Sequence, residues 1–301
     1  MISIFAPAGL GEISPGADLP GLIVAAVASD PAGPLDDGDI VVVTSKIVSK
    51  AEGRYRPAAE REQAIEAESI RTVARRGPTR IVRTRHGLTL AAAGVDNSNV
   101  APDQVLLLPL DPDASAARLR RGLTRLTGRR LGVVLSDTAG RAWRIGQTDQ
   151  AIGASGVQVF EHYAGRIDGY GNELQVTQVA LADELAAAAD LVKSKLTARP
   201  VAVVRGLADV VLPDDPAALG GVGDRGAAML VRDEATDLFR HGSREAVLAA
   251  VLSATGQADR YEELLALASE ADRVEAAITG SGLDGGEAAL LRRVLAAALA
   301  E

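Results

Sequence analysis

The stretch Thr44–Arg54, TSKIVSKAEGR, gathers lysines, serines and an arginine directly after the β-branched run IVVVT. Polar segments that follow strand ends are common ligand-binding positions in α/β proteins. Lys46 and Lys50 could contact phosphate oxygens there as point charges. A solvated basic turn accounts for the same residues equally well, so this stretch alone leaves both readings open.

A second stretch, Gly94–Asn99 (GVDNSN), offers one carboxylate and two amides within four residues. Asp96 and Asn99 suit a hard cation, or the ribose and base edge of a nucleotide. A turn rich in Asp and Asn is the alternative, and taken alone this stretch favours the turn.

The stretch Ser136–Arg144, SDTAGRAWR, follows the apolar run LGVVL and is the strongest indication of a metal or phosphate site. An aspartate at the end of an apolar strand is well placed for Mg²⁺, and Asp137 and Thr138 both carry hard oxygen ligands. Arg141 and Arg144 would supply fixed positive charge for a phosphate or a carboxylate.

The remaining candidates give weaker indications. Tyr163–Leu174 (YAGRIDGYGNEL) could line a polar pocket or form a hairpin with ordinary turn chemistry. Trp143, the single tryptophan, is expected in the core. The three histidines, His86, His162 and His241, lie far apart in the sequence and are interpreted as structural or solvated. The sequence contains neither a P-loop nor a G-x-G-x-x-G fingerprint after a strand.

Composition sets the class of protein that must position these residues. The chain has 301 residues, of which 47% are hydrophobic, and its formal net charge is −8. The length allows a large core, and the acidic balance argues against a general nucleic-acid surface. The absence of cysteine excludes disulfides and thiolate chemistry. Without a signal-peptide pattern or a run of roughly 18 apolar residues, we expect a soluble cytoplasmic protein away from membranes.

The pattern along the chain predicts a mixed α/β fold. Strands are expected at Ile40–Thr44, Thr79–Thr84, Val105–Leu108, Leu131–Leu135 and Val201–Val204. Helices are expected at Arg61–Arg76, Ser115–Leu126 and Leu181–Leu196. Residues 208–242, rich in Gly, Asp and Pro, are expected to form an exposed loop or flap. The pattern then becomes purely helical, which places a boundary near residue 243 between a domain of residues 1–242 and a helical extension of residues 243–301.

Several of these segments together resemble the coenzyme F420-0:L-glutamate ligase family. The resemblance covers about residues 4–242, and it rests on the segments TSKIVSKAEGR, AAAGVDNSNV, SDTAGRAWRIGQTD, YAGRIDGYGNEL and ADLVKSKLTARPVAVVRG, in that order. The chain most resembles the ligase half of the actinobacterial bifunctional enzyme, which also carries a nitroreductase-like domain. The resemblance implies the family's F420 ligase-like mixed α/β fold and an intertwined homodimer with the active site in a groove.

The resemblance also implies roles for individual residues. The metal ligands would be Asp96 and Asp137 for a first cation and Thr138 for a second. The catalytic residues would be Lys50, Asp137, Arg141 and Arg144. The residues implied to bind the guanine nucleotide are Leu10, Gly11, Glu12, Ile13, Ser45, Lys50, Asn99, Lys193, Ser194, Lys195, Leu196, Thr197, Ala198, Arg199 and Pro200.

Two departures from the family pattern matter. Archaeal members place a glutamine, a ligand of the second metal, where this sequence has Lys195. An ammonium group cannot ligate a cation, so Glu173, or phosphate and water, would have to replace it. Residues 243–301 are also too short for the nitroreductase-like domain, so we expect no flavin.

The implied function is a GTP-dependent ligase of coenzyme F420 biosynthesis. It would add one or more L-glutamates to F420-0 or dehydro-F420-0 through an acyl phosphate, releasing GDP and phosphate. The implied cofactors are two Mg²⁺ or Mn²⁺ ions, with K⁺ as a further candidate. The rival hypotheses are a metal-dependent nucleotide phosphohydrolase, a regulatory module that only binds GTP, and a helical extension that binds a partner.

Overall fold

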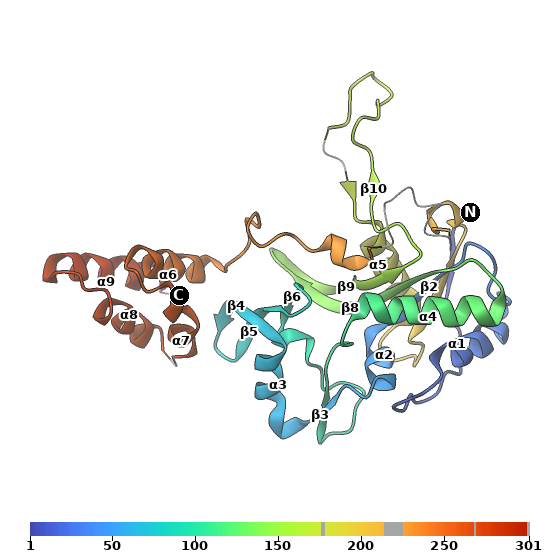
Figure 1. Cartoon of the computed structure of the whole chain (residues 1–301), viewed down its shortest axis with the longest axis horizontal. Helices are drawn as coiled ribbons and strands as arrows, with labels where there is room; N and C mark the ends of the chain where they lie inside the picture. Colours follow the sequence, from blue (N-terminus) through green and yellow to red (C-terminus); the bar gives the residue numbers. More distant parts are fainter. Residues whose placement is uncertain (176–177, 214–224, 268, 300–301) are drawn as a thin grey trace. The chain divides into compact units, whose positions relative to one another are not determined.

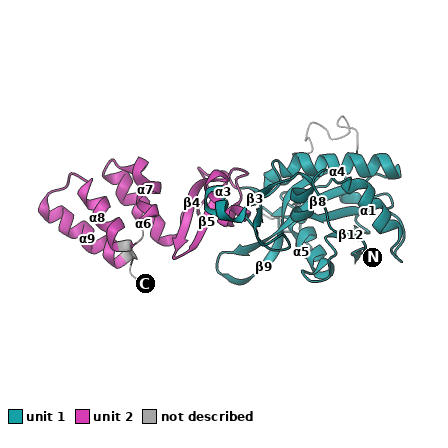
Figure 2. Ribbon diagram, turned by 90° about the horizontal axis from the view of Figure 1, so that it is seen from below, with its two compact units in different colours: residues 1–64, 95–231 teal, residues 65–94, 232–301 magenta. Residues whose placement is uncertain are grey.

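The computed structural model describes residues 1–175, 178–213, 225–267 and 269–299 (Figure 1). It mixes helices and sheets, which confirms the predicted α/β class. The chain divides into two compact units, Met1–Ala64 with Val95–Val231, and Ile65–Gly94 with Arg232–Glu301 (Figure 2). This division differs from the predicted boundary near residue 243, because a segment from the middle of the chain joins the C-terminal helices. Whether residues 1–242 alone carry the predicted activity, with residues 243–301 as an extension, is not decided by this division and stays a prediction.

The first unit is built on a five-stranded sheet. Its strands, in spatial order, are β1 (Ser3–Phe5), β12 (Val201–Arg205), β2 (Ile40–Thr44), β8 (Gly132–Arg141) and β9 (Arg144–Ser155). The central pair β2 and β8 is parallel, and the other neighbours are antiparallel. Two small antiparallel pairs add β3 (Tyr55–Pro57) to β7 (Gln104–Leu106) and β10 (Glu161–His162) to β11 (Gln178–Val179).

Helices cover both faces of this sheet. They are α1 (Leu19–Ala28), α2 (Ser45–Ala51), α4 (Pro112–Thr127) and α5 (Leu181–Lys193), and α4 and α5 lie on opposite sides of the sheet (Figure 2). The small residues Ala182, Ala186 and Ala189 let α5 pack closely on the strands. Side chains alternate along a strand, so a run such as IVVVT is buried on both faces only because helices cover both.

The second unit combines a three-stranded antiparallel sheet with the C-terminal helices. The strands are β4 (Ser69–Arg76), β5 (Thr79–Thr84) and β6 (Thr89–Ala91), in that spatial order. The helices are α6 (Ser243–Ala254), α7 (Tyr261–Ala266), α8 (Glu270–Thr279) and α9 (Gly285–Leu299). These helices confirm the predicted helical character after residue 243, and they enclose an apolar cluster that includes Leu248, Leu252, Leu264 and Leu295.

Short single-turn helices complete the described chain, at Ala58–Glu60, Ala92–Gly94, Ala208–Val210, Ala227–Leu230 and Ala258–Arg260. Within the run 208–242 that was expected to form a loop or flap, residues 214–224 lie outside the described residues. Among the described residues, the helices are all too short or too polar to cross a membrane.

The strands expected at Ile40–Thr44 and Thr79–Thr84 are confirmed to the residue. The helix expected over Arg61–Arg76 is wrong in its second half, since α3 (Arg61–Ala67) ends early and β4 follows. The β-branched Thr72 and Val73 favour a strand, and β4 pairs with β5 across a turn that contains Gly77 at φ 54°. That pairing outweighed the helical spacing of the apolar residues.

Candidate active site

The candidate site begins where the parallel strands β2 and β8 lie side by side. Thr44, the last residue of β2, is in register with Ser136 of β8. Ser45, directly after β2, and Asp137, within β8, therefore lie side by side at the carboxyl end of β2. The Ser45 hydroxyl donates a hydrogen bond to Asp137 Oδ1 at 2.8 Å. Residues Ser45–Ala51 form α2, so most of the segment that could have been a basic turn is a helix.

Asp96 reaches the same place from a separate stretch of chain. Its backbone forms a two-way bridge with Leu106 of β7, which fixes its position. Lys46 Nζ lies 2.6 Å from Asp96 Oδ2, and the Ser98 amide donates to Asp96 Oδ1 at 2.8 Å. Burial raises the pKa of Asp96, but the hydrogen bonds from Lys46 and Ser98 outweigh it and hold that pKa below its ordinary value. The stretch Gly94–Asn99 therefore contains the local hydrogen bonds of a turn, and it also brings the Asp96 carboxylate next to Lys46.

Among Asp96, Asp137 and Asp149, Asp137 alone has a raised pKa. Burial is the main cause that raises the pKa of Asp137 from 3.8 to about 6, against the stabilising hydrogen bond from Ser45. The negative charges of Asp149 and Asp96 raise it further. Carboxylates that repel one another across a site favour a bound cation, because the cation would neutralise both.

A buried polar network lies directly behind Thr138. Asp149 of β9 accepts hydrogen bonds from the Ser136 hydroxyl at 2.8 Å and from the Thr138 hydroxyl at 2.7 Å. Lys193, the last residue of α5, places Nζ 2.8 Å from Asp149 Oδ2 and 2.6 Å from Ser136 Oγ. Hydrogen bonds from Lys193, Thr138 and Ser136, together with the charge of Lys193, lower the pKa of Asp149 despite its burial.

The loop predicted to approach the nucleotide lies against α2. Leu10 and Ile13 are buried and anchor the loop, whereas the Glu12 side chain is exposed. Glu12 forms an ion pair with the nearly buried ammonium of Lys50. The structure thus joins two regions that were expected to serve the same ligand. Lys50 would have to exchange its carboxylate partner for phosphate if it binds nucleotide.

The segment Lys193–Pro200 lies at the same end of the sheet, because β12 follows it and runs antiparallel to β2. The Thr44 amide donates to the Pro200 carbonyl at 2.9 Å. The Leu196 side chain is almost fully exposed, and that of Lys195 is exposed as well. The position of the segment agrees with its expected role, while the nucleotide contacts themselves stay a prediction.

The remaining predicted residues have exposed side chains. Arg141 and Arg144 face each other at the tip of the β8–β9 hairpin, and both are exposed. The expectation of a buried Trp143 is wrong, since its side chain is 82% exposed at the hairpin turn. Asn99 is exposed and has a left-handed backbone, with φ 57°.

The stretch Tyr163–Leu174 follows its hairpin alternative. The Leu174 amide donates to the Arg166 carbonyl, and Ile167 bridges Glu173 across the turn. Glu173, the suggested replacement ligand, is exposed there. Its assignment to a second metal stays a prediction without a supporting contact among the described residues.

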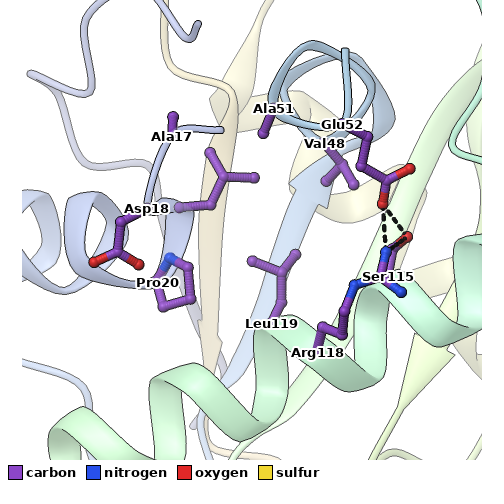
Figure 3. A pocket seen from close by; sticks show the side chains of 10 residues that line it. Ala17, Asp18, Pro20, Val48, Ala51, Glu52, Ser115, Arg118 and Leu119 are labelled. Carbon is purple, nitrogen blue, oxygen red and sulfur yellow. Dashed lines mark hydrogen bonds and ion pairs between the residues drawn. The ribbon is translucent and has the colours of Figure 1, made fainter. Parts of the chain in front are cut away.

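A separate hollow of about 230 Å³ lies between α1, α2 and α4 (Figure 3). Its floor is apolar, with Leu19, Val48 and Leu119, and Glu52 forms hydrogen bonds with Ser115 and Arg118 on one side. The residues that line it include none of the predicted site residues, so it is distinct from the cluster at the strand ends.

Comparison with known proteins identifies the family. The family model of F420-0:gamma-glutamyl ligase matches residues 9–206. This chain belongs to the F420-0:gamma-glutamyl ligase family. The Coenzyme F420:L-glutamate ligase of Archaeoglobus fulgidus is 40% identical over 225 residues, which cover 68% of this chain and 88% of that protein. Its counterpart in Methanopyrus kandleri is 36% identical over 249 residues, which cover 76% and 94% of the two chains.

A third relative, the Coenzyme F420:L-glutamate ligase of Methanothermobacter thermautotrophicus, is 36% identical over 259 residues, covering 79% of this chain and 99% of that protein. The family match ends before the C-terminal helices α6–α9 begin. Family membership establishes that the chain is a ligase enzyme.

The donor set of this ligase fits a divalent cation held together with a phosphate. Within the described residues, no group of three or more His, Cys, Asp or Glu side chains could form a metal site without other donors. The carboxylates of Asp96 and Asp137, with the hydroxyl of Thr138, are hard oxygen ligands, and Mg²⁺ is commonly bound by one or two carboxylates plus substrate phosphates. The negative charges of Asp149 and Asp96 close to Asp137, which contribute to its raised pKa after burial, favour a cation at this place.

Ser136 and Asp149 lie within the quoted segment SDTAGRAWRIGQTD, but the sequence analysis gave neither of them a role in the candidate site. Asp149 lies within a long strand whose polar first half, RIGQTD, gives way to an apolar second half. A charged residue at that transition is a signal, but only the register of β9 with β8 shows that it lies opposite Thr138.

Proposed function

We propose that this ligase joins L-glutamate to F420-0 or dehydro-F420-0 in coenzyme F420 biosynthesis and couples the reaction to GTP cleavage. Family membership supports the glutamate and F420-0 substrates. The observation that carries the proposal is the pair of carboxylates from separate stretches of chain, Asp96 and Asp137, whose repulsion contributes to the raised pKa of Asp137. Lys46 adds positive charge beside Asp96, and Lys50 of the same helix forms an ion pair with Glu12.

Formation of an amide from a carboxylate and an amine is unfavourable in water, so the carboxylate must be activated. In the proposed sequence a carboxylate oxygen of the precursor attacks the γ-phosphorus of GTP, and the bond to the β–γ bridging oxygen breaks to release GDP. The glutamate amine then attacks the acyl phosphate carbon, loses a proton and displaces phosphate. Such transfers depend chiefly on positioning and on charge stabilisation.

The side chains at the strand ends would divide this work. Asp96, Asp137 and Thr138 would hold divalent cations, Mg²⁺ or Mn²⁺, with K⁺ as a further candidate. Such cations neutralise charge on phosphate oxygens when bound. Lys50 and, within the segment Lys193–Pro200, the exposed residues 194–199 would contact GTP, and the arginines of the hairpin tip would hold anionic groups.

The proposal is tested by product analysis with the purified full chain. Wild-type protein is incubated with GTP, Mn²⁺, L-glutamate and F420-0, and mass spectrometry follows the acceptor. We expect a product heavier by one glutamyl residue for each GDP and phosphate released, and none when glutamate is omitted. Phosphate release that is independent of glutamate, without a glutamylated product, would instead identify a nucleotide phosphohydrolase.

The assembly of the ligase is a separate proposal that rests on the resemblance of its sequence motifs. We expect a homodimer in solution, as the family pattern implies. Light scattering on the full chain, at several concentrations, measures the mass directly. A mass equal to one chain across the whole range would contradict this expectation.

A further inference from the structure

The most completely buried pair of opposite charges near the candidate site joins two elements that the sequence separates. Asp149, in β9, and Lys193, at the end of α5, are only 2% and 3% exposed. Their charged atoms lie 2.8 Å apart. The role expected for Lys193 was a direct nucleotide contact, yet its ammonium is already occupied inside the protein.

Stability alone gives little reason for such a pair. Removing two charges from water costs several kcal/mol per ion, and well-packed apolar residues of similar size are often equally stable. The groups that the ion pair holds in place therefore suggest its role. Those groups are the hydroxyls of Ser136 and Thr138, which flank Asp137 in β8.

The hydrogen bonds fix which way each hydroxyl points. The hydroxyls of Ser136 and Thr138 both donate to the carboxylate oxygens of Asp149. The ammonium of Lys193 donates to Ser136 Oγ and to Asp149 Oδ2, which holds both acceptors in place. With its proton committed to Asp149 Oδ1, Thr138 keeps oxygen lone pairs for another partner.

We propose that Asp149 and Lys193 are positioning residues that turn the proton of Thr138 inward and leave its oxygen free to bind a divalent cation. This inference rests on the proposed function, in which Thr138 is a cation ligand. Lys193 acts through Asp149 and does not contact the nucleotide. Groups that orient a ligand in this way influence metal affinity nearly as strongly as the ligand itself.

The test measures binding of Mn²⁺ alone to the full chain, through the electron paramagnetic resonance signal of the free ion. Thr138→Val and Asp149→Asn are each expected to weaken Mn²⁺ binding about tenfold or more. The variant that combines them should bind as weakly as Thr138→Val alone, because both changes remove the same oriented oxygen. If the two losses add fully, Asp149 acts by some other route and the inference is wrong.

A second variant keeps the inference testable if Asp149→Asn folds poorly because it leaves the Lys193 charge unpaired. Asp149→Asn combined with Lys193→Met removes both charges, and we expect its thermal midpoint to return close to that of the wild type. Its Mn²⁺ affinity should stay low. Recovery of wild-type affinity together with stability would show that the pair is only structural.

Asp39→Asn is the matched control. Asp39 is 1% exposed and pairs with Arg205 at 2.7 Å, but it precedes β2 and so lies at the opposite end of that strand from Ser45. We expect this variant to lose stability and to keep its Mn²⁺ affinity. An equal loss of affinity in Asp39→Asn would mean that general destabilisation explains the result.

Asp137→Asn separates failure of this inference from failure of the proposed function. If Asp137→Asn loses Mn²⁺ binding and Asp149→Asn does not, the cation site stands and the positioning role is refuted. If neither variant changes Mn²⁺ binding, the cation site of the proposed function is itself refuted, and the positioning role with it.

Discussion

Two buried carboxylates, one in each unit, accept hydrogen bonds from different kinds of donor. The described hydrogen bonds to Asp149, in the first unit, all come from side chains. Glu245, in the second unit, accepts a hydrogen bond from the backbone. The donor is the amide of Arg75 in β4, at 2.8 Å. The neighbouring helix contributes Glu262, which accepts from the amide of Thr72 at 2.8 Å. Both amides belong to the first strand of the sheet order β4-β5-β6, and hence to an edge strand.

The two kinds of donor indicate two different roles for a buried carboxylate. An edge strand presents backbone donors that would otherwise pair with water or with another chain. The carboxylates of α6 and α7 satisfy these donors, so their task is architectural. Asp149 instead accepts hydrogen bonds from the hydroxyls on either side of Asp137 in the sequence. Its proposed task is to position a cation ligand. Substitutions in the two regions should therefore change different measurable quantities.

The largest effect is expected for Asp137→Ala. Loss of a carboxylate that would hold a cation removes several kcal/mol of charge stabilisation, so kcat/KM for ligation should fall about 10³-fold. The thermal midpoint should stay unchanged or rise, because a partly buried charge that neighbouring carboxylates repel is removed. Steady-state assays and thermal unfolding measure the two quantities. Turnover near that of the wild type would refute the assignment of Asp137.

The pH dependence of Mn²⁺ binding tests separately whether Asp137 is a cation ligand. Because the pKa of Asp137 is raised to about 6, a cation must displace its proton below that pH. The apparent affinity should then fall by up to about tenfold per pH unit below pH 6. Titrations from pH 5 to pH 8 measure this fall, and a flat profile would show that Asp137 is not a ligand.

The stability of the cation-free protein should change in the opposite sense. The folded state holds the Asp137 proton more tightly than the unfolded chain does, so the free energy of unfolding decreases as pH rises from about 4 to about 6. The contribution of this single group is at most about 3 kcal/mol. Asp137→Asn should lack this contribution, and comparison of denaturant unfolding of the two proteins across that range isolates it.

A smaller effect, on stability alone, is expected for Glu245→Ala in the second unit. The Arg75 amide would lose its acceptor in a buried place, which costs about 1–3 kcal/mol of unfolding free energy. Glu245→Gln retains an acceptor oxygen and should lose less. Both variants should keep wild-type Mn²⁺ affinity. A loss of Mn²⁺ binding in Glu245→Ala would break the proposed separation of the two regions.

The smallest effect is expected for Arg292→Ala. Arg292 of α9 forms an ion pair with Glu275 of α8 at 2.7 Å, and both side chains are about half exposed. Solvent and salt screen such pairs, so they contribute little to stability. The thermal midpoint and the Mn²⁺ affinity should both match those of the wild type. A clear drop in the midpoint would show that α8 and α9 depend on this pair.

Local pattern predicted much of the fold. The β-branched run IVVVT forms β2, and the helical spacing after residue 243 forms α6–α9. The position of Asp137 after the apolar run LGVVL also indicated a candidate site, although β8 continues past it to Arg141. These features depend on neighbours in the sequence, where side-chain periodicity and turn residues act directly. The prediction for Arg61–Arg76 failed because pairing with β5 decided its second half.

The sequence by itself determined which residues could bind a cation or phosphate, and it carried the motifs that mark the ligase family. Only the tertiary structure decided which of them meet. The register of β8 with β9 sets Asp149 opposite Thr138, and the end of α5 brings Lys193 to both. Hydrogen bonds between side chains depend on distances of a few tenths of an ångström. Such distances between remote segments are fixed by packing of the whole sheet and its helices, which no local pattern encodes.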